Sequence, residues 1–348
     1  MMKGQKYFTT QLIVSLILLF FLQTASAAQI NISSTNLHTY IDFSNLSSYS
    51  GTGSTATDLS GNSNHYSING TYTFSSNYGG YLNFDGSTYL LDTPTSLPSY
   101  NSSSFLWIYP NSLSTVQNLI NFNRTVSGIA DEIILQIDAS GNLSYWEWNG
   151  AVFTVTSSSC ALTSNKWYYV GFVRTDNTSS LTTNLFVNGI NCASGTNSTR
   201  IDMNGGNKYV VIGRDYRDNN NGFSGYIGGT SIYSYSLDTP TIQSNMANSI
   251  LKMVSLSSSN PKKLSTTNNL VATYTAYQDG LISFYYNNRK INGCQSLLGS
   301  SGSATCKWKS ILHGQQYVGI TFKPVGTLVN TSMSSLFPVT IGKRTNSR

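Results

Sequence analysis

Short runs of apolar and aromatic residues, each closed by Gly, Asn or Asp, recur along most of the chain. The region from Leu162 to Leu237 shows the pattern most clearly. It contains the run Trp167-Tyr-Tyr-Val170, the run Leu185-Phe-Val that ends in Asn188-Gly189, and the run Val210-Val-Ile that ends at Gly213. β-Branched and aromatic residues favour strands, while Gly, Asn and Asp favour the tight turns between them. The pattern predicts an all-β protein whose short strands are joined by turns.

The same pattern continues on both sides of this region. It predicts strands at residues 39–43, 81–84, 104–109, 152–155 and 229–235, and a hairpin of residues 133–137 and 143–148 that turns at Ser140-Gly141-Asn142. A short helix is expected at residues 239–246, directly after the last of these strands. Many short strands separated by turn residues at regular spacing are typical of β-sandwiches and jelly rolls.

Eight short motifs, taken in order and spacing, resemble the laminin-G-like, concanavalin A-like jelly roll. They are Asp58-x-Ser-Gly-Asn62-x-Asn64-His65, Leu82-x-Phe-Asp-Gly86, Trp107-Ile-x-Pro110, Lys166-Trp-Tyr-x-Val170, Leu185-x-Val-Asn-Gly189, Ile212-Gly-Arg-Asp215, Phe223-x-Gly-x-Ile227 and Ile232-Tyr233. The match spans almost all of residues 38–246. The resemblance implies two antiparallel sheets of many strands, one of them concave, with ligand-binding loops at the rim.

Four parts of the chain are distinguished by their composition. Residues 1–27 are a predicted signal peptide, 28–248 the jelly roll, 249–268 a linker rich in Ser, Asn, Pro and Lys, and 269–348 a small β-sandwich. The hairpin Phe284-Tyr-Tyr-Asn-Asn and the later Leu312-His-Gly314 corner of the last part resemble bacterial-type Ig-like repeats. The fold class expected is therefore a jelly-roll sandwich followed by an Ig-like sandwich.

The N-terminus indicates export from the cell. Lys3 and Lys6 precede an apolar run at residues 12–22, and Ala25-Ser26-Ala27 follows as a small-residue cleavage site. These are the three regions of a secretory signal peptide, so we expect cleavage before Ala28. The apolar run is shorter than the ~20 residues that a membrane span needs. The mature protein is therefore expected to be secreted and to act outside the cell or on its surface. No membrane-spanning segment is expected after the signal peptide.

Four cysteines suit an oxidising compartment. Three pairings are possible, and the simplest places one disulfide in each domain, Cys160 with Cys192 and Cys294 with Cys306. Their spacing does not fit a zinc site, and no neighbouring pattern suggests a catalytic thiol.

The two domains differ in charge. Residues 28–251 hold 7 Lys and Arg against 13 Asp and Glu, a net charge of −6, whereas residues 252–348 hold 11 Lys and Arg against Asp279 alone, a net charge of +10. The basic domain is expected to contact a polyanion or the acidic first domain, or to stay soluble through its charge. No basic motif with interleaved aromatic residues indicates nucleic acid.

Glycoside hydrolysis is the most plausible enzymatic activity on such a jelly roll, and it depends on the positions of the carboxylates. Hydrolysis needs two carboxylates roughly 5 to 9 Å apart. The adjacent Asp131 and Glu132 should face opposite sides of a strand, and Glu147 has no acid two or four residues away. The Glu-x-Asp-x-x-Glu strand of the related glucanases is absent, and the three histidines form no nucleophile–base pattern. We therefore predict a protein that is not an enzyme.

Calcium is the cofactor to consider, because the motif that begins at Asp58 supplies the hard oxygen ligands that Ca²⁺ prefers. In the similar family this loop combines with an Asp that here is replaced by Gly228. The candidate ligands are Asp58, Asn62 and Asn64, with Asp215 and Asp218 as substitutes for the missing acid. The alternative is that these residues only form turns.

Two tryptophans are the candidate ligand-binding residues. In the strand Leu143-Ser-Tyr-Trp-Glu-Trp148, alternation places Trp146 and Trp148 on the face opposite Leu143 and Tyr145. If Leu143 and Tyr145 face the core, the tryptophans form an exposed platform suited to stacking on a sugar ring. The hypothesis is a non-enzymatic, lectin-like recognition or adhesion protein that binds a glycan or glycoprotein. The alternatives are a structural component of a cell envelope, appendage or virion, and, less favoured, a glycoside hydrolase.

Overall fold

The computed structural model describes most of the chain after its N-terminal segment. The described residues are 32–126, 129–204, 206–216, 220–258, 267–277, 280–286, 289–298, 302–309, 314–324 and 333–341. The predicted signal peptide at residues 1–27 lies outside them. No helix within these ranges is long and apolar enough to span a membrane.

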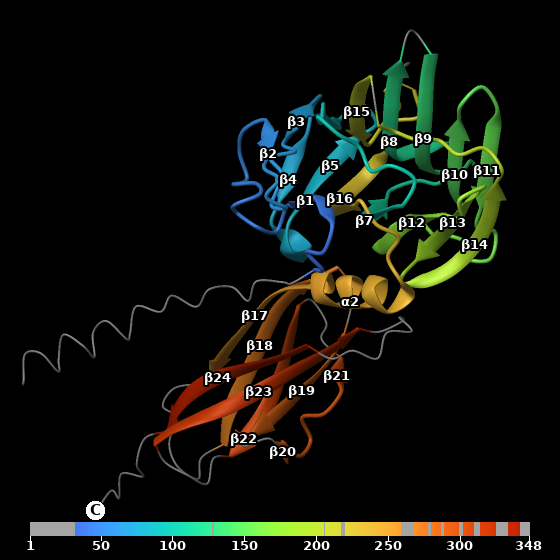
Figure 1. Ribbon diagram of the computed structural model, residues 1–348. Helices are drawn as coiled ribbons and strands as arrows, with labels where there is room; N and C mark the ends of the chain where they lie inside the picture. The colour runs from blue at the N-terminus through green and yellow to red at the C-terminus, as the bar shows by residue number, and fades with distance from the viewer. Residues whose placement is uncertain are drawn as a thin grey trace, which may run out of the picture. The chain divides into compact units, whose positions relative to one another are not determined.

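Two eight-stranded antiparallel sheets form the jelly roll (Figure 1). The first sheet has the order β14-β13-β12-β7-β16-β5-β4, with β1 paired to β16. Its strands are β1 (Leu37–Asp42), β4 (Thr73–Ser75), β5 (Tyr81–Asp85), β7 (Ser102–Pro110), β12 (Tyr168–Asp176), β13 (Leu181–Val187), β14 (Ile190–Asn197) and β16 (Ser224–Tyr233). A 3₁₀ turn, η1 (Asn77–Gly79), lies between β4 and β5.

The second sheet has the order β11-β10-β9-β8-β15-β6-β3-β2. Its strands are β2 (Thr55–Ala56), β3 (Tyr66–Asn69), β6 (Tyr89–Asp92), β8 (Gln117–Val126), β9 (Ile129–Ile137), β10 (Leu143–Trp148), β11 (Val152–Thr156) and β15 (Asn207–Ile212). The hairpin expected at residues 133–148 is present as β9 and β10, whereas β8 is a strand that the sequence pattern did not predict.

Alternating side chains of both sheets meet in one buried core. Leu143 and Tyr145 of β10, Leu135 and Ile137 of β9 and Phe172 of β12 are among its members, all at most 1% exposed. Truncating a fully buried Phe of this kind typically costs about 3–5 kcal/mol. The core therefore fixes which face of each strand points inward, and with it which face points out.

Turn chemistry joins neighbouring strands as the motifs indicated. Asn188 and Gly189, between β13 and β14, have φ values of 50° and 76°. A two-residue hairpin turn of type I′ needs positive φ at both positions, which Asn and Gly adopt with least strain. The Asn188 side-chain oxygen also accepts a hydrogen bond from the Tyr169 backbone N–H, at 2.9 Å.

Helix α2 (Thr239–Ile250) follows the jelly roll and is longer than the expected 239–246. Its Ser249 Oγ accepts a 2.8 Å hydrogen bond from Trp107 Nε1 of the first sheet. Trp107 and Trp167 are 2% and 6% exposed and belong to a buried cluster that includes Ile242 and Met246 of the helix. Both tryptophans are therefore structural.

The C-terminal part consists of two further antiparallel sheets. One holds β17 (Leu251–Ser258), β18 (Thr267–Ala276) and β22 (Ser303–Lys309); the other holds β19 (Gly280–Tyr286), β20 (Arg289–Lys290), β21 (Leu297–Leu298), β23 (Gly314–Pro324) and β24 (Met333–Ile341). Tyr274 of the first sheet packs against Phe322 of the second, with ring centroids 5.1 Å apart, so the sheets form a small sandwich.

The expected linker at residues 249–268 is corrected by this arrangement. Residues 251–258 form β17, which pairs with β18, and residues 259–266 lie outside the described part of the chain. An alternating Leu-Lys-Met-Val-Ser-Leu segment can pair as a strand whatever the Ser-rich composition around it suggests. The domain limits and the Ig-like assignment of the sandwich stay predictions.

The disulfides join the cysteines in the simplest of the three pairings, Cys160 with Cys192 and Cys294 with Cys306. Each bridge lies within one of the two β-sandwiches.

Candidate functional site

Trp146 and Trp148 lie side by side on β10, on the side of the second sheet that faces away from the core. Both side chains are half-buried, whereas Leu143 and Tyr145 on the opposite side are fully buried. The two indole rings are nearly parallel, with an interplanar angle of 8° and centroids 6.4 Å apart. Parallel rings at adjacent outward positions present one continuous apolar surface.

The strands beside β10 continue this surface with polar side chains. One row of cross-strand partners runs over four strands: Trp148 of β10 pairs with Glu132 of β9, Glu132 pairs with Asn123 of β8, and Asn123 pairs with Tyr209 of β15. In the next row Trp146 pairs with Ile134, Ile134 with Asn121, and Asn121 with Val211. We call the following outward-facing set the amide face: Asn118, Asn121, Asn123, Glu132, Ile134, Trp146, Trp148, Tyr209 and Val211.

Three asparagines of β8 carry buried polar atoms without hydrogen-bond partners. Asn118, Asn121 and Asn123 are 0%, 0% and 1% exposed. Both side-chain polar atoms of Asn118, the oxygen of Asn121 and the nitrogen of Asn123 lack a partner. Buried polar groups are almost always paired in proteins, and each unmade bond costs about 1–3 kcal/mol. The amide face therefore holds several donors and acceptors that a bound molecule or water can satisfy.

Glu132 is the acid of this face. It is fully buried, and its Oε1 accepts a 2.6 Å hydrogen bond from Asn121 Nδ2. Asp131, its neighbour in the chain, forms an ion pair with Arg124 on the other side of the sheet. The two acids thus face opposite ways, as alternation requires.

Glu147 lies inside the jelly roll. It is 1% exposed, and its Oε2 accepts a 2.5 Å hydrogen bond from Tyr145 Oη and lies 3.9 Å from the Nε of the fully buried Arg174. Its other oxygen accepts a bond from Asn197 Nδ2 at 3.2 Å. A carboxylate enclosed in this way has a structural role. Because Glu147 faces the core and Glu132 faces away from it, the two acids lie on opposite sides of the sheet and cannot flank one glycosidic bond.

A second aromatic pair lies at the far end of the amide face. Tyr209 of β15 stacks on Tyr216 of the following loop, with ring centroids 4.1 Å apart and an interplanar angle of 21°. In the same loop the Arg214 guanidinium lies 3.3 Å from the ring centroid of Tyr89 on β6. The tryptophan pair and the tyrosine pair thus bracket the asparagines of β8.

The Asp58 loop, proposed for calcium, is filled by its own hydrogen bonds. Asp58 Oδ1 accepts from the backbone N–H groups of Tyr40 and Ser60, and Oδ2 accepts from Ser60 Oγ and the Asn64 N–H. A carboxylate has about four lone-pair positions, and here four donors occupy them. Asn62 and Asn64 direct their amide nitrogens at the His38 carbonyl. These contacts are those of a turn, which is the alternative interpretation of these residues.

The substitute acids do not change this result. Asp215 is 8% exposed in the loop after β15, and Asp218 lies outside the described residues. Among the residues that are described, no group of three or more His, Cys, Asp or Glu side chains could hold a metal. Calcium binding stays a prediction.

Gly228 shows why the acid of the similar family is missing here. A Cβ atom at this position would lie 2.2 Å from Tyr277 Oη, and the hydroxyl of Tyr277 donates a 3.2 Å hydrogen bond to the Gly80 carbonyl. Tyr277 is 2% exposed and cannot move aside easily. Only glycine fits beside this ring.

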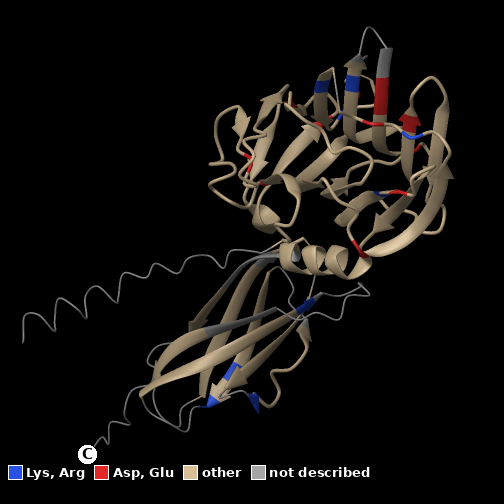
Figure 2. Cartoon of the chain, in the orientation of Figure 1, with Lys and Arg blue, Asp and Glu red and all other residues tan. Residues whose placement is uncertain are grey.

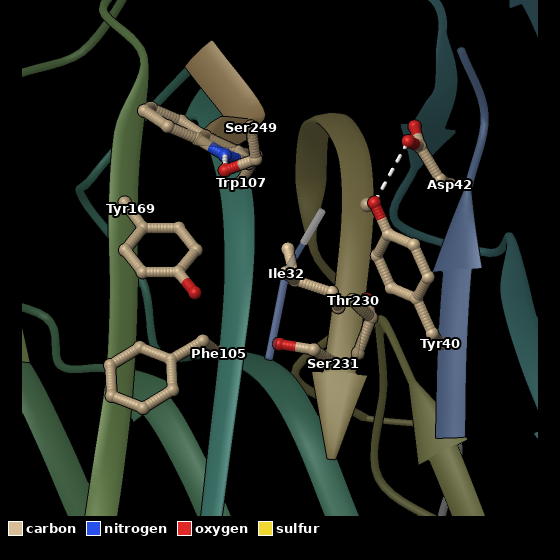
Figure 3. Close-up of a pocket in the computed structure, with 10 residues that line it drawn as sticks. Ile32, Tyr40, Asp42, Phe105, Trp107, Tyr169, Thr230, Ser231 and Ser249 are labelled. Atoms are coloured by element: carbon tan, nitrogen blue, oxygen red, sulfur yellow. Dashed lines mark hydrogen bonds between the residues drawn. The ribbon is translucent and has the colours of Figure 1, made fainter. Parts of the chain in front are cut away.

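A partly open pocket lined by residues of the first sheet is too small for a ligand (Figure 3). Tyr40, Trp107, Thr230 and Ser249 contribute to its lining, and Tyr40 Oη donates a 2.9 Å hydrogen bond to Asp42 Oδ2. Its interior offers about 10 Å³ to a water-sized sphere, which is room for one water. The amide face is therefore the better candidate for a binding site.

Charge is distributed unequally over the described residues (Figure 2). Asp and Glu occur in the jelly roll, whereas β20, β22 and β23 of the C-terminal sandwich carry Lys and Arg and no described acid. Contact of these strands with a polyanion or with the acidic jelly roll stays a prediction.

Comparison with known proteins supports the jelly roll. Residues 83–243 match the family model of the concanavalin A-like lectin/glucanases superfamily, so this part of the chain is a jelly-roll domain of that type. None of the curated proteins compared with the chain matches it.

Three solved structures are similar to parts of the chain. Domain 4 of AbnA, an extracellular GH43 arabinanase from Geobacillus stearothermophilus, in complex with arabinotriose, is 19% identical over 61% of this chain and 98% of that one, with a TM-score of 0.48. The CBM40 of the Ruminococcus gnavus IT-sialidase bound to α2,3-sialyllactose is 16% identical over 42% of this chain and 82% of that one, with a TM-score of 0.37. The binding domain of Paraclostridial Mosquitocidal Protein 1 is 13% identical over 83% of this chain and 76% of that one, with a TM-score of 0.47. Similarities this weak do not indicate what this chain binds.

Proposed function

We propose that this chain is a secreted, non-enzymatic recognition protein whose jelly roll binds a glycan on the amide face. One observation carries the proposal: a half-buried, parallel pair of tryptophans on β10 lies on the same face as buried side-chain amides of β8 that lack hydrogen-bond partners, with only β9 between the two strands. The predicted signal peptide and the disulfides favour an extracellular site of action.

Sugars have the two kinds of surface that this face can satisfy. The C–H face of a pyranose is apolar and stacks on an aromatic ring, which Trp146 and Trp148 supply. The hydroxyl groups at its edge both donate and accept hydrogen bonds, so they match the unpartnered atoms of Asn118, Asn121 and Asn123. An apolar surface with a few convergent polar groups is the usual composition of a small-molecule site.

The carboxylates of this face favour binding over hydrolysis. Glu132 is the single acid among the residues that define the amide face, and Glu147 is enclosed in the core with Arg174. Because glycoside hydrolysis requires two carboxylates around one bond, the geometry supports recognition without turnover.

A glycan array with two matched variants tests the proposal. Binding of residues 28–348 should be lost, or weakened by at least roughly tenfold, in Trp146→Ala and Trp148→Ala, because each substitution removes a stacking surface. Tyr317→Ala is the control, since Tyr317 is a 53% exposed aromatic residue of the C-terminal sandwich. Glycan binding that survives both tryptophan substitutions, or no binding to any array component, contradicts the proposal.

A further inference from the structure

We propose that the C-terminal sandwich carries a second binding site, an edge of four cations that holds an acidic polysaccharide. The set that we call the basic edge consists of Arg289 and Lys290 of β20 and Lys307 and Lys309 of β22. It lies outside the jelly roll and takes another class of ligand than the amide face does. Its support comes from the exposure of the four side chains, the fold that gathers them, and the composition of the sequence around them.

All four side chains of the basic edge are exposed. Along β22 buried and exposed residues alternate, so Lys307 and Lys309 point outward on either side of the buried Trp308. Residues two positions apart on a strand are separated by about 6.8 Å. The two lysines therefore extend from the same face of β22 at a regular spacing, as suits a polymer whose charges repeat.

The fold brings β20 and β22 together although they belong to different sheets. Each is an edge strand of its sheet. The disulfide between Cys294 and Cys306 joins the segment that follows β20 to β22. Arg289 pairs with Tyr286, and the ring of Tyr286 packs on Trp308, with ring centroids 5.2 Å apart. The Lys and Arg residues of β20 and β22 thus gather at one end of the sandwich (Figure 2).

The sequence around the basic edge is almost free of acids. Asp279 is the single acid among residues 252–348, so the segments here that the structure does not describe add no other. In the sequence Asp279 directly precedes Gly280, where β19 begins, whereas Arg289 pairs with Tyr286 at the other end of that strand, about 20 Å away. The ion pairs of the described residues all lie within the jelly roll. Uncompensated cations held close together attract a partner with many negative charges.

The basic edge is far from the point where the chain enters the sandwich. The chain leaves α2 and enters β17 at Leu251, which pairs with Ala276 of β18. Lys307 pairs with Asn269, and Asn269 and Ala276 are about 24 Å apart along β18. This position favours an external partner over the acidic jelly roll of the same chain.

The neighbours of these cations fit a sugar polymer better than a membrane or a nucleic acid. Thr267 and Thr305, exposed on the same outward face as the lysines, donate and accept hydrogen bonds as sugar hydroxyls do. Membrane-binding surfaces need apolar anchors, and the exposed large hydrophobic residue in the described part of the sandwich is Tyr317, on β23. Single-stranded nucleic acids stack their bases on aromatic rings, whereas Trp308 is 4% exposed. The ligand class is therefore a polysaccharide that carries carboxylates or sulfates.

A series of polymers with one backbone tests this site. Dextran, carboxymethyl-dextran and dextran sulfate share a glucan chain and differ in its charged groups. At about 0.15 M salt, where the Debye length is about 8 Å, residues 28–348 should bind the two acidic polymers and not dextran, and added salt should weaken the binding. Lys307→Gln with Lys309→Gln should weaken it at least roughly tenfold by biolayer interferometry, and Arg289→Gln with Lys290→Gln should act in the same way.

A charge-matched double variant is the control. Lys166→Gln with Lys323→Gln removes two charges from exposed positions outside the basic edge. Lys166 precedes β12 of the jelly roll, and Lys323 pairs with Leu281 near the start of β19. This variant should bind the acidic polymers as tightly as the wild type. A loss equal to that of the edge variants would show that net charge attracts the polymer, and would overturn the site.

The remaining outcomes also decide the question. Tighter binding of duplex DNA or of phosphatidylserine vesicles than of either acidic polymer would overturn the ligand class. No binding of any acidic polymer would overturn the proposal, and lower melting temperatures of the edge variants would then indicate a contact within the protein. The edge variants should keep the glycan binding proposed for the amide face, so either site can fail without the other.

Discussion

Replacing Glu147 by Gln should destabilise the jelly roll strongly although it changes no shape. The substitution removes the carboxylate that faces the fully buried Arg174 guanidinium. Arg174 keeps its hydrogen bonds to the carbonyls of Ser99 and Ile201, at 3.2 and 3.1 Å. It also converts a charge-assisted bond from Tyr145 into a neutral one. Breaking a buried ion pair by removing one partner costs about 3–5 kcal/mol, a large part of the ~5–15 kcal/mol that stabilises a typical domain.

The control is an ion pair of the same chemistry near the surface. Asp176 pairs with Arg200 at 2.5 Å, with side chains 18% and 30% exposed, so Asp176→Asn should cost much less stability than Glu147→Gln because solvent screens the exposed pair. Urea unfolding followed by tryptophan fluorescence measures both differences, since the transition midpoint reports stability when the slope is unchanged.

A double variant separates lost charge from lost packing. Glu147→Leu combined with Arg174→Met removes both charges, and replacing a buried pair by apolar residues is often neutral or stabilising, so it should recover most of the loss. If Glu147→Gln destabilises the protein no more than the surface control Asp176→Asn does, the buried ion pair does not stabilise this region.

Three further measurements address the metal, the buried acid and a disulfide. Thermal melts of residues 28–348 in millimolar calcium and in chelator test the calcium prediction. The melts should coincide if the four donors that fill the Asp58 carboxylate leave no position for the ion, whereas a higher midpoint with calcium would show that the native protein binds it. Burial raises the pKa of Asp92 to about 6, so its contribution to stability is full below about pH 4 and is lost as pH rises through 6. Asp92→Asn should therefore raise the melting temperature at pH 7.5 and change it little at pH 4, and equal shifts at both values would contradict the assignment. Cys160→Ala with Cys192→Ala opens a loop of 32 residues and should cost roughly 3–4 kcal/mol by urea unfolding, an estimate refuted by a loss below about 1 kcal/mol.

Much of the fold could be predicted because its determinants are local. The hairpin of residues 133–148 follows from alternation and a turn, and Asn188-Gly189 marks the next hairpin by its turn residues. The orientation of Trp146 and Trp148 follows from the period of two in a strand, once Leu143 and Tyr145 are assigned to the core.

The asparagines of the amide face were missed although a signal was present. In Ile120-Asn-Phe-Asn123 the apolar residues alternate with asparagines, which indicates a strand with a polar outer face. The register shifts between Asn118 and Ile120, which breaks the alternation at the start of β8. Asn is also a common turn residue, which weakens the strand signal of this segment.

The sequence by itself determined many of the strands, such as β9 and β10, and which side of each faces the core, because both depend on the order of residues along one strand. Only the tertiary structure decided which strands are neighbours. Trp148, Glu132, Asn123 and Tyr209 come from four strands and form one row through cross-strand register alone. Gly228 likewise depends on Tyr277, a residue far along the chain that excludes any side chain there. A binding face and a steric exclusion arise from contacts between distant segments, which a pattern along the chain does not contain.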